Sequence, residues 1–244
     1  MFRQCIIFLG LLALATSAEW PDLKTTWGLN PFGAAFYSQP RTASDAEAAG
    51  WTLMASCDGT FLGHRYADPS DPSLVLIYDD AGYIAGVQSV LLEQYTDPSV
   101  PPTQEAYTKT EWMGQAAWMT TAYFVDPAVI CAGGRSAADF AAQGTGDRLL
   151  IQLGATDNLV SIPLTQAEAD LDPAWFDHYC FLGMGDHYLQ FDYTPDQDCN
   201  SVLPFQILYD GGVIIGFVWQ HMASLPGDMW EHPDDMAIGA IIDR

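Results

Sequence analysis

The histidines are the residues of this chain with the widest chemical range. Four of the five lie in the last third of the sequence, at His178, His187, His221 and His232. Imidazole is the commonest protein ligand of transition metals, and three histidines around one ion leave a position open for water or a substrate. The pattern predicts a metal site formed by His187, His221 and His232, which the fold must assemble because the spacings are long.

Carboxylates near the last two histidines would complete such a site. Asp228 and Glu231 are candidate catalytic bases, because a carboxylate can accept the proton of a metal-bound water or orient an imidazole ligand. This interpretation describes a secreted metal-dependent enzyme with a divalent metal ion as its cofactor. The alternative is that each histidine simply donates a hydrogen bond to a backbone carbonyl.

The segment His221–Met236 is the candidate site loop. It follows an apolar run and concentrates two histidines, Trp230 and four acidic residues. Loops on a rigid β scaffold are where binding residues gather. Trp230 is therefore a candidate ligand-binding residue, and Tyr188, next to His187, is another. The many aromatic residues also allow carbohydrate binding by stacking on sugar rings, although most such rings belong to a core.

The familiar catalytic motifs are missing from the sequence. It contains no Gly-x-Ser-x-Gly elbow, no His-Glu-x-x-His pair, no phosphate-binding glycine loop and no EF-hand loop. This favours a binding protein over an enzyme.

An internal repeat supplies the elements that would position these residues. The stretch 36–57, FYSQPRTASDAEAAGWTLMASC, aligns with 159–180, LVSIPLTQAEADLDPAWFDHYC. Each contains a hydroxyl residue followed three positions later by glutamate, the capping box that opens a helix. In the first copy this pair is Ser44 and Glu47, and in the second it is Thr165 and Glu168.

The repeat resumes further along the chain. Residues 74–86 resemble 205–216, each with two apolar runs around an Asp-x-Gly turn that is typical of a β-hairpin. The alignment pairs Cys57 with Cys180 and His64 with His187. Since only the second copy has additional histidines, His187 is the first place to look for a site.

The repeat divides the chain into four parts. We expect a signal peptide over 1–18, a first β-rich unit over 27–131, a linker with a short helix over 132–147 and a second β-rich unit over 148–244. Short runs of Ile, Val, Leu, Phe, Tyr and Trp between Gly, Pro and Asp predict strands. The predicted fold is mainly β (α+β), with two related antiparallel β-rich units and short edge helices packed as one pseudo-symmetric body. The stretch 104–119 allows a helix, although Gly114 weakens that interpretation.

The N-terminus predicts the compartment. Arg3, the apolar run Cys5–Ala15 and the small residues up to Ala18 form a secretory signal peptide, and the run is too short to span a bilayer. We therefore expect a secreted, extracellular protein without membrane insertion.

The cysteines agree with an oxidising compartment. The disulfide candidates are Cys57, Cys131, Cys180 and Cys199, and their spacing leaves three pairings open. The first unit ends at a cysteine shortly after Asp126, whereas the second stops just after Asp243. We therefore expect the natural chain to continue beyond Arg244 to another cysteine, unless Cys199 has taken over the pairing.

The charge restricts the partners. A formal net charge of −23 repels nucleic acid and anionic membranes and favours calcium, other metal ions or basic partners. The sequence therefore predicts a secreted acidic extracellular binding protein built from two diverged repeats. Its predicted partner is a divalent cation, a matrix component or a small-molecule ligand.

Overall fold

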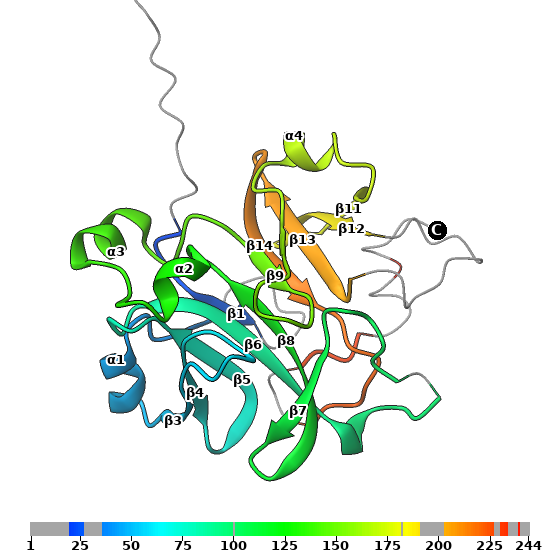
Figure 1. Cartoon of the computed structure of the whole chain (residues 1–244). Coiled ribbons are helices and arrows are strands. Elements are labelled where there is room, and N and C mark those ends of the chain that lie inside the picture. The colour runs from blue at the N-terminus through cyan, green and yellow to red at the C-terminus, as the bar shows by residue number, and fades with distance from the viewer. Residues whose placement is uncertain are drawn as a thin grey trace, which may run out of the picture.

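Strands dominate the computed structural model of the protein (Figure 1), which describes residues 20–26, 36–99, 101–181, 183–190, 203–226, 230–233 and 239. The described strands pair in antiparallel fashion, and the helices are short, so the predicted mainly β fold class is confirmed. The predicted signal peptide, Cys199 and the catalytic candidate Asp228 lie outside the described residues. Within them, no helix is long and apolar enough to cross a membrane.

The larger sheet has eight strands. These are β3 (Thr52–Ala55), β4 (His64–Asp68), β5 (Asp71–Tyr78), β6 (Ile84–Leu92), β7 (Thr108–Trp112), β8 (Gln115–Tyr123), β9 (Leu150–Gln152) and β10 (Leu159–Ser161). Seven of them follow the order β10-β9-β8-β6-β5-β4-β3, and β7 pairs with the first part of β8 on the same edge that β9 uses further along. The central strands are buried on both faces, as their unbroken apolar runs require.

The stretch 104–119 forms a β-hairpin, so its interpretation as a helix is wrong. Strands β7 and β8 turn at Met113 and Gly114, both of which have positive φ (50° and 76°). A right-handed helix has negative φ at every residue, whereas a tight hairpin needs positive φ at its turn. The threonines of β7 favour the extended conformation through their β-branched side chains.

The smaller sheets lie beside this one. A four-stranded sheet has the order β11 (Phe176–Phe181), β12 (Gly185–Leu189), β13 (Phe205–Asp210) and β14 (Val213–Trp219). A two-stranded ribbon joins β1 (Lys24–Thr26) to β2 (Phe36–Ser38). A single apolar core contains residues of both β5 and β13, so the two larger sheets share one interior.

Short helices connect the strands. They are α1 (Ala43–Ala48), η1 (Glu93–Tyr95), α2 (Pro127–Ile130), α3 (Ala137–Gln143) and α4 (Gln166–Ala169). The capping box of Thr165 and Glu168 at α4 is confirmed. The box predicted from Ser44 and Glu47 is wrong: α1 begins two residues earlier than that box requires, so its cap is Thr42, whose hydroxyl accepts a bond from the Asp45 amide.

The two halves of the chain repeat the same contacts around a pair of tyrosines. Tyr78 of β5 donates from its hydroxyl to the Pro40 carbonyl at 2.8 Å, and Tyr209 of β13 donates to Pro163 at the same distance. Each of these rings meets a second tyrosine edge-on, with centroids 5.3 Å apart in the first half and 5.1 Å apart in the second. These contacts agree with a duplicated unit, and the unit boundaries stay a prediction. Strands β9 and β10, placed in the second unit by the sequence, bond to the sheet of the first.

Strand register places the copies one residue differently from the sequence alignment. Tyr78 pairs with His64, whereas Tyr209 pairs with Asp186. The structural counterpart of His64 is therefore Asp186, and His187 corresponds to Arg65. The sequence alignment paired His64 with His187 wrongly, because the turns that precede them differ in length.

The cysteines also differ from the sequence alignment in which residues correspond between the two halves. Cys57 and Cys131 form a disulfide that joins the end of β3 to the end of α2, which confirms part of the cysteine prediction. Among the described residues, Cys180 is a free, exposed cysteine. It pairs with Asp186 across β11 and β12, so it occupies the position of Ser56 beside His64 rather than that of Cys57.

Candidate functional site

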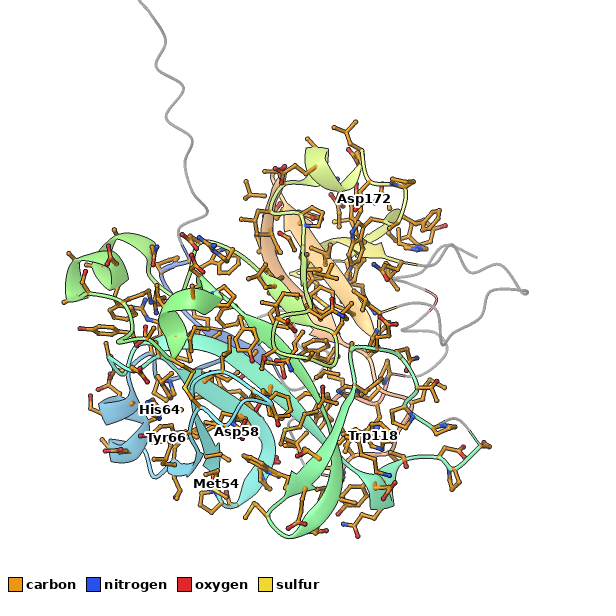
Figure 2. All side chains as sticks on the ribbon, in the orientation of Figure 1. Met54, Asp58, His64, Tyr66, Trp118 and Asp172 are labelled. Atoms are coloured by element: carbon orange, nitrogen blue, oxygen red, sulfur yellow. A yellow bond between two sulfur atoms is a disulfide. The ribbon has the colours of Figure 1, made fainter. Side chains whose placement is uncertain are left out.

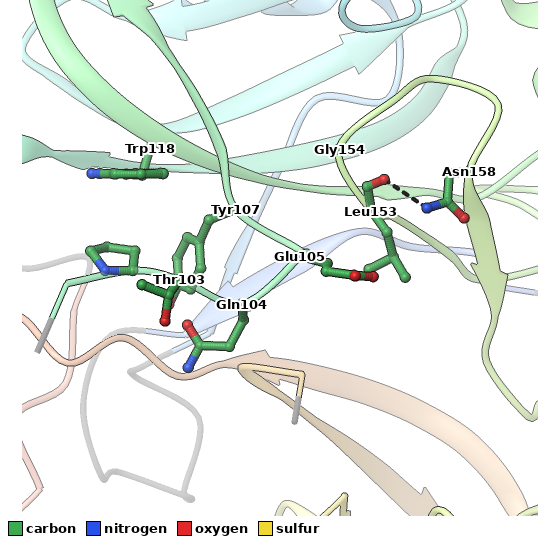
Figure 3. Close-up of a pocket in the computed structure, with 9 residues that line it drawn as sticks. Thr103, Gln104, Glu105, Tyr107, Trp118, Leu153, Gly154 and Asn158 are labelled. Atoms are coloured by element: carbon green, nitrogen blue, oxygen red, sulfur yellow. Dashed lines mark hydrogen bonds between the residues drawn. The ribbon is translucent and has the colours of Figure 1, made fainter. Parts of the chain in front are cut away.

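A hollow of about 500 Å³ opens beside the β7–β8 hairpin. Its walls come from the segment before β7, from β8 and from the turn between β9 and β10 (Figure 3). The side chains that matter chemically are those of Gln104, Glu105, Tyr107, Trp118, Leu153 and Asn158. The hollow is shallow and open to solvent, so a ligand bound in it would keep part of its own surface exposed.

Strand alternation turns Trp118 toward the hollow. Its neighbours Ala117 and Met119 point into the core and are fully buried, so Trp118 points to the other face of β8 and stays half-buried. The Lys109 ammonium lies 5.1 Å from the centroid of its ring and 2.7 Å from the Glu93 carboxylate. The Lys109 ammonium thus fixes the orientation of the indole ring, which also lines the hollow.

Two other segments contribute polar side chains to the lining of the hollow. Glu105 and Asn158 are exposed and Gln104 is half-buried. Asn158 is fixed in place, because its side-chain amide donates to the Leu153 carbonyl at 3.0 Å and its backbone carbonyl accepts the Leu153 amide at 2.8 Å. The side chains around the hollow therefore combine two aromatic rings, those of Trp118 and Tyr107, with amide and carboxylate groups.

Tyr107 connects this hollow to a half-buried histidine, His221. Its hydroxyl lies 2.9 Å from Nδ1 of His221, and Nε2 of His221 lies 2.6 Å from the Ser89 hydroxyl, which in turn contacts Thr120 at 2.9 Å. Burial lowers the pKa of His221 to about 3 and raises that of Tyr107. Both groups are therefore neutral at pH 7, and the imidazole uses one nitrogen as donor and the other as acceptor.

These hydrogen bonds of His221, together with two further contacts, hold the chain after β14 against the first half. The Trp230 ring lies 5.1 Å from the His221 ring, and Thr96 forms a β-bridge with Ala223. Trp230 belongs with Tyr107 and Leu225 to a small apolar cluster behind the hollow. The described part of the loop predicted from the sequence thus packs behind the hollow, and the hollow itself is lined by other segments.

The three predicted metal ligands occupy separate surroundings. His187 of β12 is buried, donates from Nδ1 to the Tyr179 carbonyl at 3.1 Å and has its pKa lowered by that burial. His232 donates from Nε2 to the Leu225 carbonyl at 2.9 Å. In the described part of the chain, no group of three or more His, Cys, Asp or Glu side chains is placed to hold a metal ion. The structure does not bring His187, His221 and His232 together.

The other predicted site residues have supporting positions. Tyr188 is buried and donates to the Asp170 carboxylate at 2.6 Å, and burial together with that bond raises its pKa to about 12. Trp230 is half-buried against His221, and Glu231 next to it is also half-buried. Among the described side chains, neither Trp230 nor Tyr188 lines the hollow.

Sequence reasoning missed the residues that line the hollow. Trp118 carried no alternation signal, because its neighbours Ala117 and Met119 are also apolar. Gln104 and Asn158 carried none, because they meet only when β9 is placed beside β8. Comparisons of the sequence with models of protein families, with characterised proteins and with solved structures found no match.

Proposed function

We propose that this chain is a secreted, acidic extracellular binding protein whose ligand is a small, neutral, polyhydroxylated molecule such as an oligosaccharide. The observation that carries the proposal is the hollow beside Trp118, which is lined by an indole and by amide and carboxylate side chains. The disulfide and the predicted signal peptide support the extracellular setting.

The chemistry of the hollow favours sugars over other small ligands. The C–H face of a sugar ring is weakly positive and packs on the negative face of an indole, while its hydroxyls bond to amides and carboxylates. Glu105 and the net charge of −23 disfavour anions. The ammonium of Lys109 already lies over the Trp118 ring, so a second cation there would meet repulsion.

Calorimetric titration of the mature protein with neutral trisaccharides tests the proposal. The panel contains glucose-, galactose- and N-acetylglucosamine-based compounds. We expect one of them to bind at a single site. Trp118→Ala is expected to weaken that binding at least about tenfold, which corresponds to about 1.4 kcal/mol in binding free energy. Trp118→Phe keeps a flat ring and is expected to retain part of the affinity.

A matched pair of glutamates serves as the control. Glu105→Gln changes a residue of the hollow, and Glu111→Gln makes the same change on an exposed position of β7 outside it. Only the first is expected to alter the affinity. Absence of binding across the panel contradicts the proposal. Calcium binding that is lost in Glu105→Gln would show instead that the hollow holds a cation.

A further inference from the structure

Three polar side chains meet at the edge of the large sheet next to the disulfide. Nδ1 of His64 lies 3.1 Å from the Ser56 hydroxyl, and Nε2 of His64 lies 3.1 Å from the Asp80 carboxylate. Ser56 follows β3, His64 begins β4 and Asp80 follows β5. Figure 2 shows His64 beside Tyr66 on the α1 side of the molecule, well away from Trp118.

The hydrogen bonds give this cluster a direction. A carboxylate only accepts hydrogen bonds, so the contact with Asp80 places the ring hydrogen of neutral His64 on Nε2. The lone pair of Nδ1 then faces Ser56 and accepts the hydrogen of its hydroxyl. A serine, an imidazole and a carboxylate in this sequence of bonds are the parts of an activated nucleophile.

The surrounding backbone holds the carboxylate in place. Oδ2 of Asp80 accepts the Gly133 amide at 2.9 Å, and the Asp80 amide donates to the Ile130 carbonyl at 2.9 Å. The disulfide between Cys57 and Cys131 joins the residue after Ser56 to the same connection. Three separate segments are therefore fixed around one imidazole.

A reagent can reach the cluster from solvent. Ser56 is exposed, and the side chains of His64 and Asp80 each keep 32% of their surface accessible. In the second half, Cys180 and Asp186 occupy the places of Ser56 and His64. That half has a thiol and a carboxylate at these positions but no imidazole between them.

We propose that Ser56 is a nucleophile for small activated carboxylic esters, with His64 as its general base and Asp80 as the positioning residue. The Ser56 oxygen forms a bond to the ester carbonyl carbon while Nδ1 of His64 takes the hydroxyl proton. The bond from that carbon to the leaving alkoxide then breaks, and the leaving oxygen receives the proton from His64. Water, deprotonated by the same nitrogen, hydrolyses the acyl-serine to a carboxylic acid and restores Ser56.

The experiment uses p-nitrophenyl acetate and the mature protein carrying Cys180→Ser, which removes the exposed thiol. Release of p-nitrophenol is followed by absorbance, and the acetylated residue is located by peptide mass spectrometry. We expect one acetyl group per chain on the peptide that contains Ser56. Ser56→Ala is expected to abolish this acetylation, and His64→Gln to slow it about 100-fold.

The positioning role of Asp80 is tested by a measurement that a loss of packing alone would not change. Asp80→Asn is expected to slow acetylation at least tenfold, because its amide can donate to Nε2 and shift the ring hydrogen to Nδ1. The ¹⁵N shifts of the His64 ring report that change of tautomer. Asp80→Glu is expected to restore part of the rate.

Ser70→Ala provides the matched control. The Ser70 hydroxyl is exposed and donates to the Asp68 carboxylate at 2.7 Å, and no histidine joins that pair in the described structure. Its loss is expected to leave the acetylation rate unchanged. Acetyl groups confined to lysines or the N-terminus, or a rate that Ser56→Ala leaves intact, would overturn the proposal. Thermal unfolding of each variant verifies that it is folded.

Discussion

The two halves of the molecule share a buried scaffold and differ in what stands on it. In each half a buried tyrosine bonds to a proline carbonyl and meets a second tyrosine edge-on. At the sheet edge, however, the first half has Ser56 and His64 where the second has Cys180 and Asp186. Shared packing with unlike polar edges means that the scaffold fixes positions while the edge residues determine chemistry.

A second difference lies after β6 in the first half and after β14 in the second. Strand β6 leads into the β7–β8 hairpin, which builds the wall of the hollow. Strand β14 leads instead into the segment around His221, which packs behind that hollow. The segment after β14 thus supports the hollow from behind, and both proposed sites belong to surfaces of the larger sheet.

Removal of the disulfide should give the largest difference in stability between a variant of the first half and a variant of the second. Cys57→Ser with Cys131→Ser opens a link between residues 74 positions apart, and loop entropy predicts a loss of about 4 kcal/mol in the free energy of unfolding. Urea unfolding measures it. Cys180→Ser, at an exposed free cysteine, is the control and is expected to change stability by less than about 0.5 kcal/mol. Equal losses in the two variants would contradict this difference between the halves.

Acid sensitivity tests the contact between the halves at His221. The pKa is lowered to about 3 in the folded protein, against an ordinary value near 6.5, so the unfolded chain binds the proton more readily. The contribution of this neutral histidine to stability is complete above about pH 6.5 and is lost as the pH falls toward 3.

His221→Gln should therefore flatten the fall of stability with pH. We expect the free energy of unfolding of the natural protein to drop more steeply between pH 6.5 and 4 than that of the variant, by up to about 1.4 kcal/mol per pH unit. Chemical denaturation at a series of pH values measures both slopes. The same slope in both proteins would show that His221 takes up its proton without unfolding.

The tyrosine scaffold should respond alike in the two halves. Tyr78→Phe and Tyr209→Phe each remove a buried hydroxyl and leave a proline carbonyl unpaired, which costs about 1–3 kcal/mol. Urea unfolding should give values for the two variants that agree within about 1 kcal/mol. A much larger cost in one half would show that the shared contacts are not equivalent in energy.

The helix caps give the smallest expected effect. Thr42→Ala and Thr165→Ala each remove a side-chain acceptor from a helix start, at a cost of about 1 kcal/mol. In the second cap the Thr165 amide also donates to the Glu168 carboxylate, at 3.1 Å. Thermal unfolding should therefore show Glu168→Ala to be destabilising through this cap, whereas Glu47→Ala would act through the loss of the bond that Glu47 accepts from the Tyr66 hydroxyl at 2.9 Å.

Local patterns predicted the scaffold better than the sites. Apolar runs and Asp-Gly turns predicted β5, β6, β13 and β14, because strand alternation and turn chemistry depend on neighbours in sequence. The capping box at Thr165 was readable for the same reason. The register of His64 was not, because an additional residue in a turn moves every later pair and only the hydrogen bonds reveal it.

The hollow depends on contacts between distant residues. Gln104, Trp118 and Asn158 become neighbours only through the order β10-β9-β8 with β7 on the same edge. His221 and Ser89 are 132 positions apart, so no local pattern links them. The five histidines drew attention to metal chemistry because residue type is visible in a sequence, whereas the partner of each ring nitrogen is not.

One measurement tests the proposed binding site most directly. The protein labelled with 5-fluorotryptophan is titrated with the neutral trisaccharide that binds, and the Trp118 resonance is assigned by its loss in Trp118→Phe. The hollow predicts that the Trp118 signal shifts with saturation, while those of Trp51 and Trp175, buried in the two halves, stay in place. An unmoved Trp118 signal at saturation, or shifts confined to other tryptophans, would contradict the proposal that this hollow binds the ligand.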